Sequence, residues 1–482
     1  MNTHFYKRLI IVFLTVFTAV LFFCPVSFAR TITQIMPTLT ITEEYSDNYL
    51  KTDTNKQEEY ITSYGLGFSL GFLNKKSQVY FAYNPKYRDY KNLDNRDGFE
   101  HNLSATGLFT PSKFTRINAK LAYTSTSQDT DYAGRTWENS ADISGSTRLT
   151  KNTDFHFSQS YSRQFDQQVR TGAYREHDVN KTSAGLATDF GKKDRAGLDF
   201  SYEFDNYANS DADEYTKYRP TGFVTYWFTP LNGFDSKISY EKTDFDQNSV
   251  NDIDTYEGHV RYLRKFSKHL NGYIKYRHSY SERDSGDHNI FHPSVGFDWK
   301  VTKDSGISLG AGMLFSRWSN TSTYSDSTGP FLDIDAYKTF NFSRRGSLSI
   351  TGSSGYTEAG EDAASLGYNI YYKAGLRLSY QILKRLSSNV FASYKRDEFS
   401  GTAASDRKDN TMSAGAGFSW LALKWLRFNL SYSYTDFDTD TTQRGDYTEN
   451  KATFSLSLIP EKPVRMKASP SRQSLEKEIY NY

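Results

Sequence analysis

The chain has 482 residues, and its mean hydropathy is -0.68 although it contains 37 Tyr and 35 Phe. Its formal net charge is +2, from 58 basic and 56 acidic residues, which gives no indication of a nucleic-acid partner. Many aromatic residues in a chain of low mean hydropathy are typical of strands in which only every second side chain faces lipid, and they argue against a helical membrane protein.

The first 29 residues have the three parts of a secretory signal peptide. Lys7 and Arg8 precede an apolar run over residues 9–23, and small residues stand three and one positions before a cut after Ala29. The single cysteine of the chain, Cys24, lies inside this segment, so the mature chain would carry neither a disulfide nor a Cys-ligated metal. No later segment has the eighteen or so uninterrupted apolar residues of a transmembrane helix. A mature chain that sits in a membrane would therefore cross it with strands.

The stretch from Tyr60 to Tyr90 predicts a β-hairpin. Its first half alternates Leu66, Phe68 and similar residues with Gly and Ser, a period of two that indicates a strand with one apolar and one small, polar face. Residues 74–77 form a tight turn, and the return strand alternates again before a polar stretch. One short turn followed by one long loop is typical of a hairpin in an outer-membrane barrel.

The same pattern recurs along the chain and predicts an all-β fold, a transmembrane antiparallel β-barrel of about 22 strands within a range of about 18–24. A first strand begins near Pro37, and the series closes with residues 452–458. The intervening predicted strands are 99–110, 116–126, 137–150, 155–165, 180–190, 196–206, 222–228, 237–245, 256–264, 270–281, 291–301, 307–316, 331–340, 348–356, 368–380, 388–394, 412–420 and 427–434. A propeller would also repeat, but it needs four strands per blade and a recurring motif, and neither occurs here.

The connections fall into two sets that orient the barrel. Short turns such as GKKD and NFSRRG carry Lys and Arg, whereas the alternate connections are longer and rich in Asp, Asn, Ser and Thr. Short turns belong to the periplasmic rim and long loops to the cell exterior. The domain organisation expected from this pattern is a signal peptide over residues 1–29, a barrel over residues 30–460 and a polar periplasmic tail over residues 461–482.

Side chains opposite the apolar face of each strand are expected to line the lumen. The candidates are basic residues beside tyrosines, which could attract carboxylates and contact sugar rings. The alternative is that these cations are paired with acids on neighbouring strands and have no role in transport. The candidate lumen-lining residues are Arg261, Tyr273, Lys275, Arg277, Tyr371, Lys373 and Arg377.

No motif for catalysis or for a cofactor stands out. The nine histidines are scattered, and neither HExxH nor GxSxG occurs. The acidic loop from Asp246 to Asp254 has oxygen ligands at alternate positions but lacks the Gly and Glu of a calcium-binding loop, and a solvated loop is the simpler interpretation. The sequence therefore predicts no enzyme, no catalytic residues, no metal and no cofactor.

The N-terminal sequence PTLTITEEYSDNYL, with Pro37, Glu44, Tyr45, Asp47 and Asn48, resembles the opening of porin-like outer-membrane β-barrel proteins associated with exopolysaccharide biosynthesis, including the PEP-CTERM group. This resemblance implies an integral barrel of the Gram-negative outer membrane that takes part in polysaccharide export. It also implies contact with outer-membrane lipid, lipopolysaccharide, polysaccharide and periplasmic export components as partners. A passive uptake porin and a plugged structural or adhesive barrel remain alternatives with the same fold.

Overall fold

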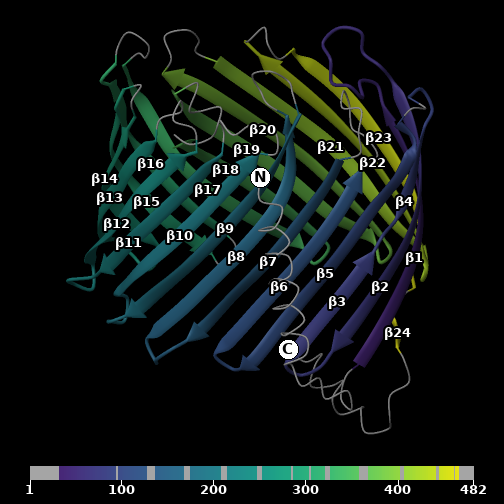
Figure 1. Cartoon of the computed structure of the whole chain (residues 1–482), viewed down its shortest axis with the longest axis horizontal. Helices are drawn as coiled ribbons and strands as arrows, with labels where there is room; N and C mark the ends of the chain where they lie inside the picture. Colours follow the sequence, from purple (N-terminus) through teal and green to yellow (C-terminus); the bar gives the residue numbers. More distant parts are fainter. Residues whose placement is uncertain are drawn as a thin grey trace.

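The computed structural model describes residues 32–93, 96–126, 136–167, 174–207, 214–246, 252–283, 286–302, 305–320, 326–357, 367–401, 407–440, 445–460 and 462–465. Most of these residues lie in strands that follow one another around a single wall, inclined to its axis (Figure 1). Within these ranges there is no helix long and apolar enough to span a bilayer. The predicted signal peptide and most of the predicted C-terminal tail lie outside the described residues.

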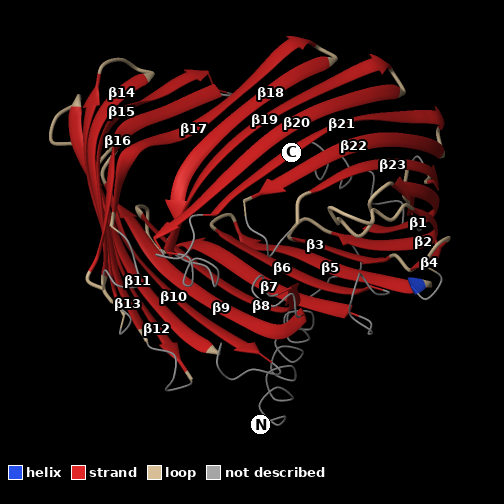
Figure 2. Ribbon diagram, turned by 90° about the horizontal axis from the view of Figure 1, so that it is seen from above, coloured by secondary structure: helices blue, strands red, loops and turns tan. Residues whose placement is uncertain are grey.

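The strands pair antiparallel in chain order, and the wall closes on itself, as the view from above shows (Figure 2). β3 and β4 share one place in the wall between β2 and β5, and β24 continues the line of β23 beside β1, so the barrel has 22 strands, as predicted. The strands are β1 (Ile32–Ser46), β2 (Glu59–Leu73), β3 (Ser77–Tyr83), β4 (Lys86–Tyr90), β5 (Gly98–Ser112), β6 (Thr115–Thr126), β7 (Thr136–Arg148), β8 (Thr153–Gln167), β9 (Tyr174–Asp189), β10 (Arg195–Tyr207), β11 (Tyr215–Tyr226), β12 (Asn232–Phe245), β13 (Ile253–Lys265), β14 (Leu270–Glu282), β15 (His288–Thr302), β16 (Ser305–Trp318), β17 (Ser327–Ser343), β18 (Gly346–Thr357), β19 (Gly367–Leu383), β20 (Leu386–Gly401), β21 (Arg407–Leu423), β22 (Leu426–Thr439), β23 (Tyr447–Leu458) and β24 (Val464–Arg465).

The period-two pattern separates the two faces of the wall. On β2, Leu66 is 60% exposed and Phe68 is 47% exposed on the outward face, while glycine and serine occupy the inward positions from Ser63 to Gly71. Some boundaries differ from the prediction: β11 begins at Tyr215 rather than at residue 222, because Thr216, Pro220 and Gly222 interrupt the apolar side chains on its outward face and leave no clear alternation. β1 likewise begins at Ile32, before the predicted start near Pro37.

The ring closes where β1 meets the end of the chain. The upper part of β1 pairs with β23, from Leu39 opposite Leu458 to Ser46 opposite Lys451, and its lower part pairs with β24. Side chains reinforce this closure: Lys451 Nζ lies 2.7 Å from a Glu44 carboxylate oxygen. These contacts join residues about 400 positions apart, so the barrel forms only when both ends of the chain are in place.

One junction of the wall is incomplete. β17 pairs with β16 along its whole upper part, from Ser327 to Lys338, but it pairs with β18 only from Asp335 downward. Just above that point the Ser354 hydroxyl replaces the ladder: it accepts a hydrogen bond from the Ile334 amide at 2.9 Å and donates one to the Leu332 carbonyl. Pro330, which has no N–H to give, is tolerated at this unpaired edge of β17.

Apolar side chains close this junction in place of backbone hydrogen bonds. Tyr356 of β18 and Ile370 of β19 lie on the outward face of their strands, as the alternation from Ile350 and Leu376 shows. Both nevertheless pack against Phe331 of β17. The cluster also contains Ile290 of β15 and Leu314 of β16, which lie on the inward face of their strands. The outward face of the β18–β19 ends therefore overlaps the inward face of β15–β17, and we call this contact the overlap joint.

Candidate functional site: the inner wall of the barrel

The inward face of the barrel carries most of its polar side chains. On β14, Ile274 and Tyr276 are exposed on the outward face, so Tyr273, Lys275 and Arg277 lie on the inward face. The cross-strand partners of these residues on β13 and β15 also face inward, and most of them are again polar or charged. The inner wall is thus the polar surface on which we look for a binding site.

Ion pairs cover the inner wall from β9 to β17. Glu257 of β13 bonds Arg219 of β11 at 3.1 Å and Arg277 of β14 at 2.8 Å, so one carboxylate connects two strands. Opposite charges on adjacent strands stabilise a sheet and leave little net charge on this part of the surface. The other pairs of this charged wall include Lys181 with Glu203, Lys217 with Glu241, Arg261 with Asp235 and with Asp298, and Lys275 with Asp333.

Four of the candidate lumen-lining residues belong to this charged wall. The Arg261 guanidinium bonds Asp235 at 2.8 Å and Asp298 at 3.1 Å, and it lies 5.3 Å from the centre of the Tyr273 ring. Tyr273 is only 6% exposed because its ring lies flat across neighbouring strands, over positions where Gly296 and Gly310 have no side chain. Its aromatic face is therefore used in packing.

The long side chains of Lys275 and Arg277 reach partners away from their own strand. Lys275 Nζ lies 3.0 Å from Asp333, three strands along the wall on β17, and Arg277 lies 4.2 Å above the ring of Tyr356 in the overlap joint. Small residues between β14 and β17, such as Gly312, leave room for this crossing. Both cations are thus held against the wall by named partners.

The remaining candidates lie on β19. Tyr371 and Lys373 contact each other, with Lys373 Nζ 4.9 Å from the centre of the ring. Arg377 is exposed on the same face, and among the described residues no carboxylate lies within ion-pair distance of Arg377 or Lys373. The candidates therefore divide into cations paired on the charged wall and cations exposed on β19.

A second sector of the inner wall, from β18 through β23 to β2, is rich in hydroxyl, amide and glycine residues, which lie among the cations of β19 and a few ion pairs such as Lys451 with Glu44. Ser379, Asn389 and Ser393 are exposed on the inward face, while Leu376 and Val390 are exposed on the outward face of the same strands. Both faces of this sector therefore meet solvent or lipid rather than packed protein. The inward hydroxyls bond one another across strands, as between Thr40 and Ser457 at 3.3 Å.

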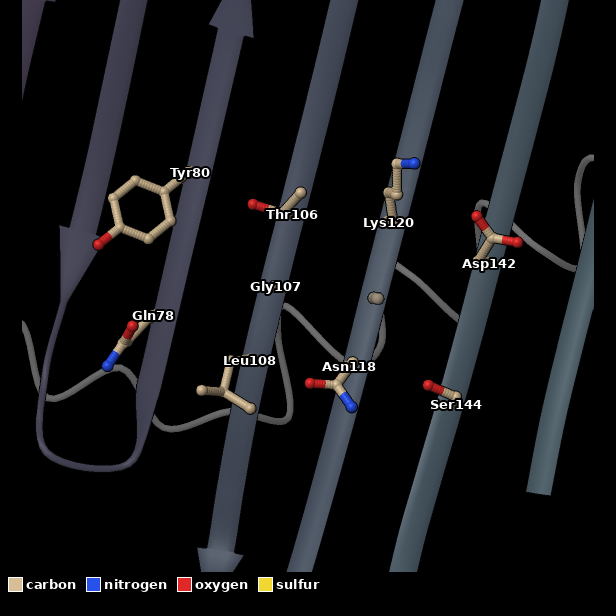
Figure 3. Close-up of a pocket in the computed structure, with 10 residues that line it drawn as sticks. Gln78, Tyr80, Thr106, Gly107, Leu108, Asn118, Lys120, Asp142 and Ser144 are labelled. Carbon is tan, nitrogen blue, oxygen red and sulfur yellow. The ribbon is translucent and has the colours of Figure 1, made fainter. Parts of the chain in front are cut away.

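A polar hollow of about 310 Å³ lies on the inward face of β3, β5, β6 and β7. Successive strands contribute its side chains (Figure 3), and the register places the polar ones on the inward face of the sheet. We call it the lower niche; its polar lining consists of Gln78, Tyr80, Thr106, Asn118, Lys120, Asp142 and Ser144.

Sequence reasoning did not find the lower niche. Its residues come from four strands, and no motif connects them in the sequence. The available signal was the Gly and Ser face of β2, because the Tyr80 ring lies 3.0 Å from the place where a Gly71 side chain would begin.

Among the described residues no three His, Cys, Asp or Glu side chains gather as metal ligands do. The acidic segment expected to be a solvated loop, residues 246–254, falls largely outside the described residues.

The C-terminal strands match a known family. Residues 340–458, which form the wall from the end of β17 to the end of β23, match the model of the family described as "Putative beta-barrel porin 2". Among curated proteins, none matches the sequence significantly.

Several solved structures share the fold at very low sequence identity. The ferric-catecholate import receptor Fiu from E. coli K12 is 10% identical with a TM-score of 0.55, over 89% of this chain and 81% of that one. The ferric enterobactin receptor PfeA from Pseudomonas aeruginosa is 8% identical with a TM-score of 0.52, over 88% and 80%. The siderophore receptor PirA from Acinetobacter baumannii is 8% identical with a TM-score of 0.51, over 88% and 80%. The whole chain thus shares the closed-barrel fold of these outer-membrane receptors, and its C-terminal strands resemble the porin-like family.

Proposed function

We propose that the barrel is a non-enzymatic, water-filled pore through which polysaccharide leaves the cell across the outer membrane. The observation that carries the proposal is the sector from β18 to β2, where hydroxyl and amide side chains such as Asn389 and Ser393 are exposed on the inward face. Such groups exchange hydrogen bonds with the hydroxyls of a sugar as readily as with water, so a polymer can pass along them without a fixed binding geometry. The N-terminal resemblance to barrels of exopolysaccharide clusters supports the same cargo.

The proposal includes the segments that flank the barrel. Residues 1–29 direct export to the periplasm, and cleavage follows Ala29. The long loops meet lipopolysaccharide and the outside, and the short cationic turns meet the periplasmic components that deliver the polymer. Of the candidate lumen-lining residues, Lys373 and Arg377 face the path of the cargo directly, and Arg261, Lys275 and Arg277 act through their carboxylate partners.

The experiment is deletion of the chain in its native strain followed by restoration, with secreted polysaccharide and envelope integrity measured together. Loss and recovery of the secreted polymer with an intact envelope is the expected result. Normal secretion would contradict export and leave passive uptake of small solutes as the function of the pore. Steady conductance of the purified protein in a planar bilayer is expected in either case, and its absence would indicate a plugged barrel and contradict both.

A further inference from the structure

The lower niche has the size and the chemistry of a sugar subsite. Its volume of about 310 Å³ corresponds to roughly ten water molecules, which is room for one pyranose ring with its hydroxyls. The amides of Gln78 and Asn118 can both donate and accept hydrogen bonds, and the Thr106 hydroxyl can do the same. Groups of this kind match the vicinal hydroxyls of a sugar, each of which also donates and accepts.

The two charged residues of the lower niche stand opposite each other. Lys120 of β6 and Asp142 of β7 are register partners on the inward face (Figure 3). One donates and the other accepts, and together they contribute no net charge. A neutral sugar is therefore favoured over a carboxylated one at this position.

Tyr80 supplies an apolar platform beside these polar groups. Its ring lies against β2 at Gly71, where an added side chain would start 3.0 Å from the ring carbon Cε1. The glycine thus lets the ring lie close to the wall, and Tyr80 is 41% exposed. An aromatic face held in this way can contact the C–H face of a pyranose ring.

A second hollow lies higher on the same wall. It has about 290 Å³, and its lining includes Thr38, Asn84, Lys86, Glu100 and Asn102. It again pairs a cation with an anion, since Lys86 Nζ lies 2.7 Å from Glu100. We call it the upper niche. Along β5, Asn102 of the upper niche and Thr106 of the lower niche are four residues apart, which is about 13 Å.

Small residues connect the two niches. Ala82, Ser104 and Ala122 occupy the inward positions between them on β3, β5 and β6. These short side chains place no bulky group between the two niches, so an extended ligand can lie along the wall.

We infer that the lower and upper niches are two separate subsites for one neutral oligosaccharide that lies along the wall of β1–β7 and spans the distance between them, with Tyr80 as the stacking platform. This inference rests on the proposed function and names the kind of polymer the pore accepts. The inference does not require a particular sugar configuration, because the amide and hydroxyl groups of the lining can each donate or accept a hydrogen bond.

The test measures interruption of the single-channel current of the full barrel by added oligosaccharides. The probes are neutral hexaoses of gluco, manno and galacto configuration, with a hexauronate of the same length as the charged comparison. At least one neutral hexaose is expected to block the wild-type channel at lower concentration than the hexauronate. Tyr80→Ala should raise the half-blocking concentration about tenfold, and Tyr80→Phe should leave it nearly unchanged.

The matched control is Tyr83→Ala, since Tyr83 is on the same strand and equally exposed, but on the outward face. The half-blocking concentration of the neutral hexaose should be the same for this variant as for the wild type. A conducting channel that no neutral hexaose blocks, or that only the hexauronate blocks, would overturn the inference and leave the pore function intact. Equal block of Tyr80→Ala and wild type would also overturn it. A protein without conductance would instead contradict the proposed function.

Discussion

Reversal of one exposed cation should change the ion selectivity of the pore. Arg377 is the clearest position, because it is exposed on the inward face of β19 and no described carboxylate lies within ion-pair distance of it. Arg377→Glu changes the local charge by two units. For an ion that passes about 8 Å away through water, each unit charge contributes about 0.5 kcal/mol, so the two units contribute about 1 kcal/mol before screening.

Salt reduces this effect in a way that can be calculated. At 0.1 M salt the Debye length is about 10 Å, which reduces the interaction by about half. The interaction free energy of a passing anion then becomes about 0.5 kcal/mol less favourable, and that of a cation becomes more favourable by the same amount. The ratio of anion to cation permeability should therefore fall about fivefold. At 1 M salt the Debye length is about 3 Å, and the variant should be nearly indistinguishable from the wild type.

The assay is the reversal potential of the purified barrel in a planar bilayer under a salt gradient. Arg385→Glu is the control, because it makes the same charge change in the short turn between β19 and β20, at the rim of the barrel. Its effect should be smaller than that of Arg377→Glu. An unchanged reversal potential for Arg377→Glu at low salt, in a channel that conducts, would refute the assignment of this side chain to the conducting path.

Three further changes test other parts of the barrel. Cysteines at Thr40 and Ser457, which are register partners at the ring closure, should form a disulfide on mild oxidation, and failure to cross-link would argue against a closed ring. Phe331→Ala, at a side chain that is 2% exposed, should lower the free energy of unfolding in detergent by about 3–5 kcal/mol; a loss below about 1 kcal/mol would mean that the overlap joint is not packed. Asp235→Asn removes one of two carboxylates from Arg261 and should leave the barrel folded, while the reversal potential moves toward anions; movement toward cations would contradict an inward position for this pair.

The sequence predicts the strands and the two faces of the wall because both follow from a local period of two. Leu66 and its neighbouring glycines show the pattern within a few residues, and the number of strands follows from counting its repeats. The prediction fails at boundaries such as the start of β11, where polar residues occupy both faces of the strand.

The contacts of the inner wall could not be predicted from the sequence. Nothing in the sequence indicates that Lys275 reaches Asp333, because that contact depends on small residues two strands away and on the register of four strands. The lower niche has the same origin: Tyr80 lies flat only because Gly71 stands beside it in the wall. Alternation tells which face a side chain occupies, whereas its neighbours on that face depend on the register across the whole sheet.

The overlap joint makes the two rims of the barrel unequal. Around the rim of short turns the described strands are joined by backbone hydrogen bonds from β1 through β17 and β18 to β23, which pairs back to β1, so hydrogen-bond geometry fixes the circumference there. At the opposite rim the ring is cut between β17 and β18, and the cut ends are held by the side chains around Phe331 and Tyr356. At the rim of long loops, the width of the barrel therefore depends on how far the two edges overlap, and not only on the number of strands.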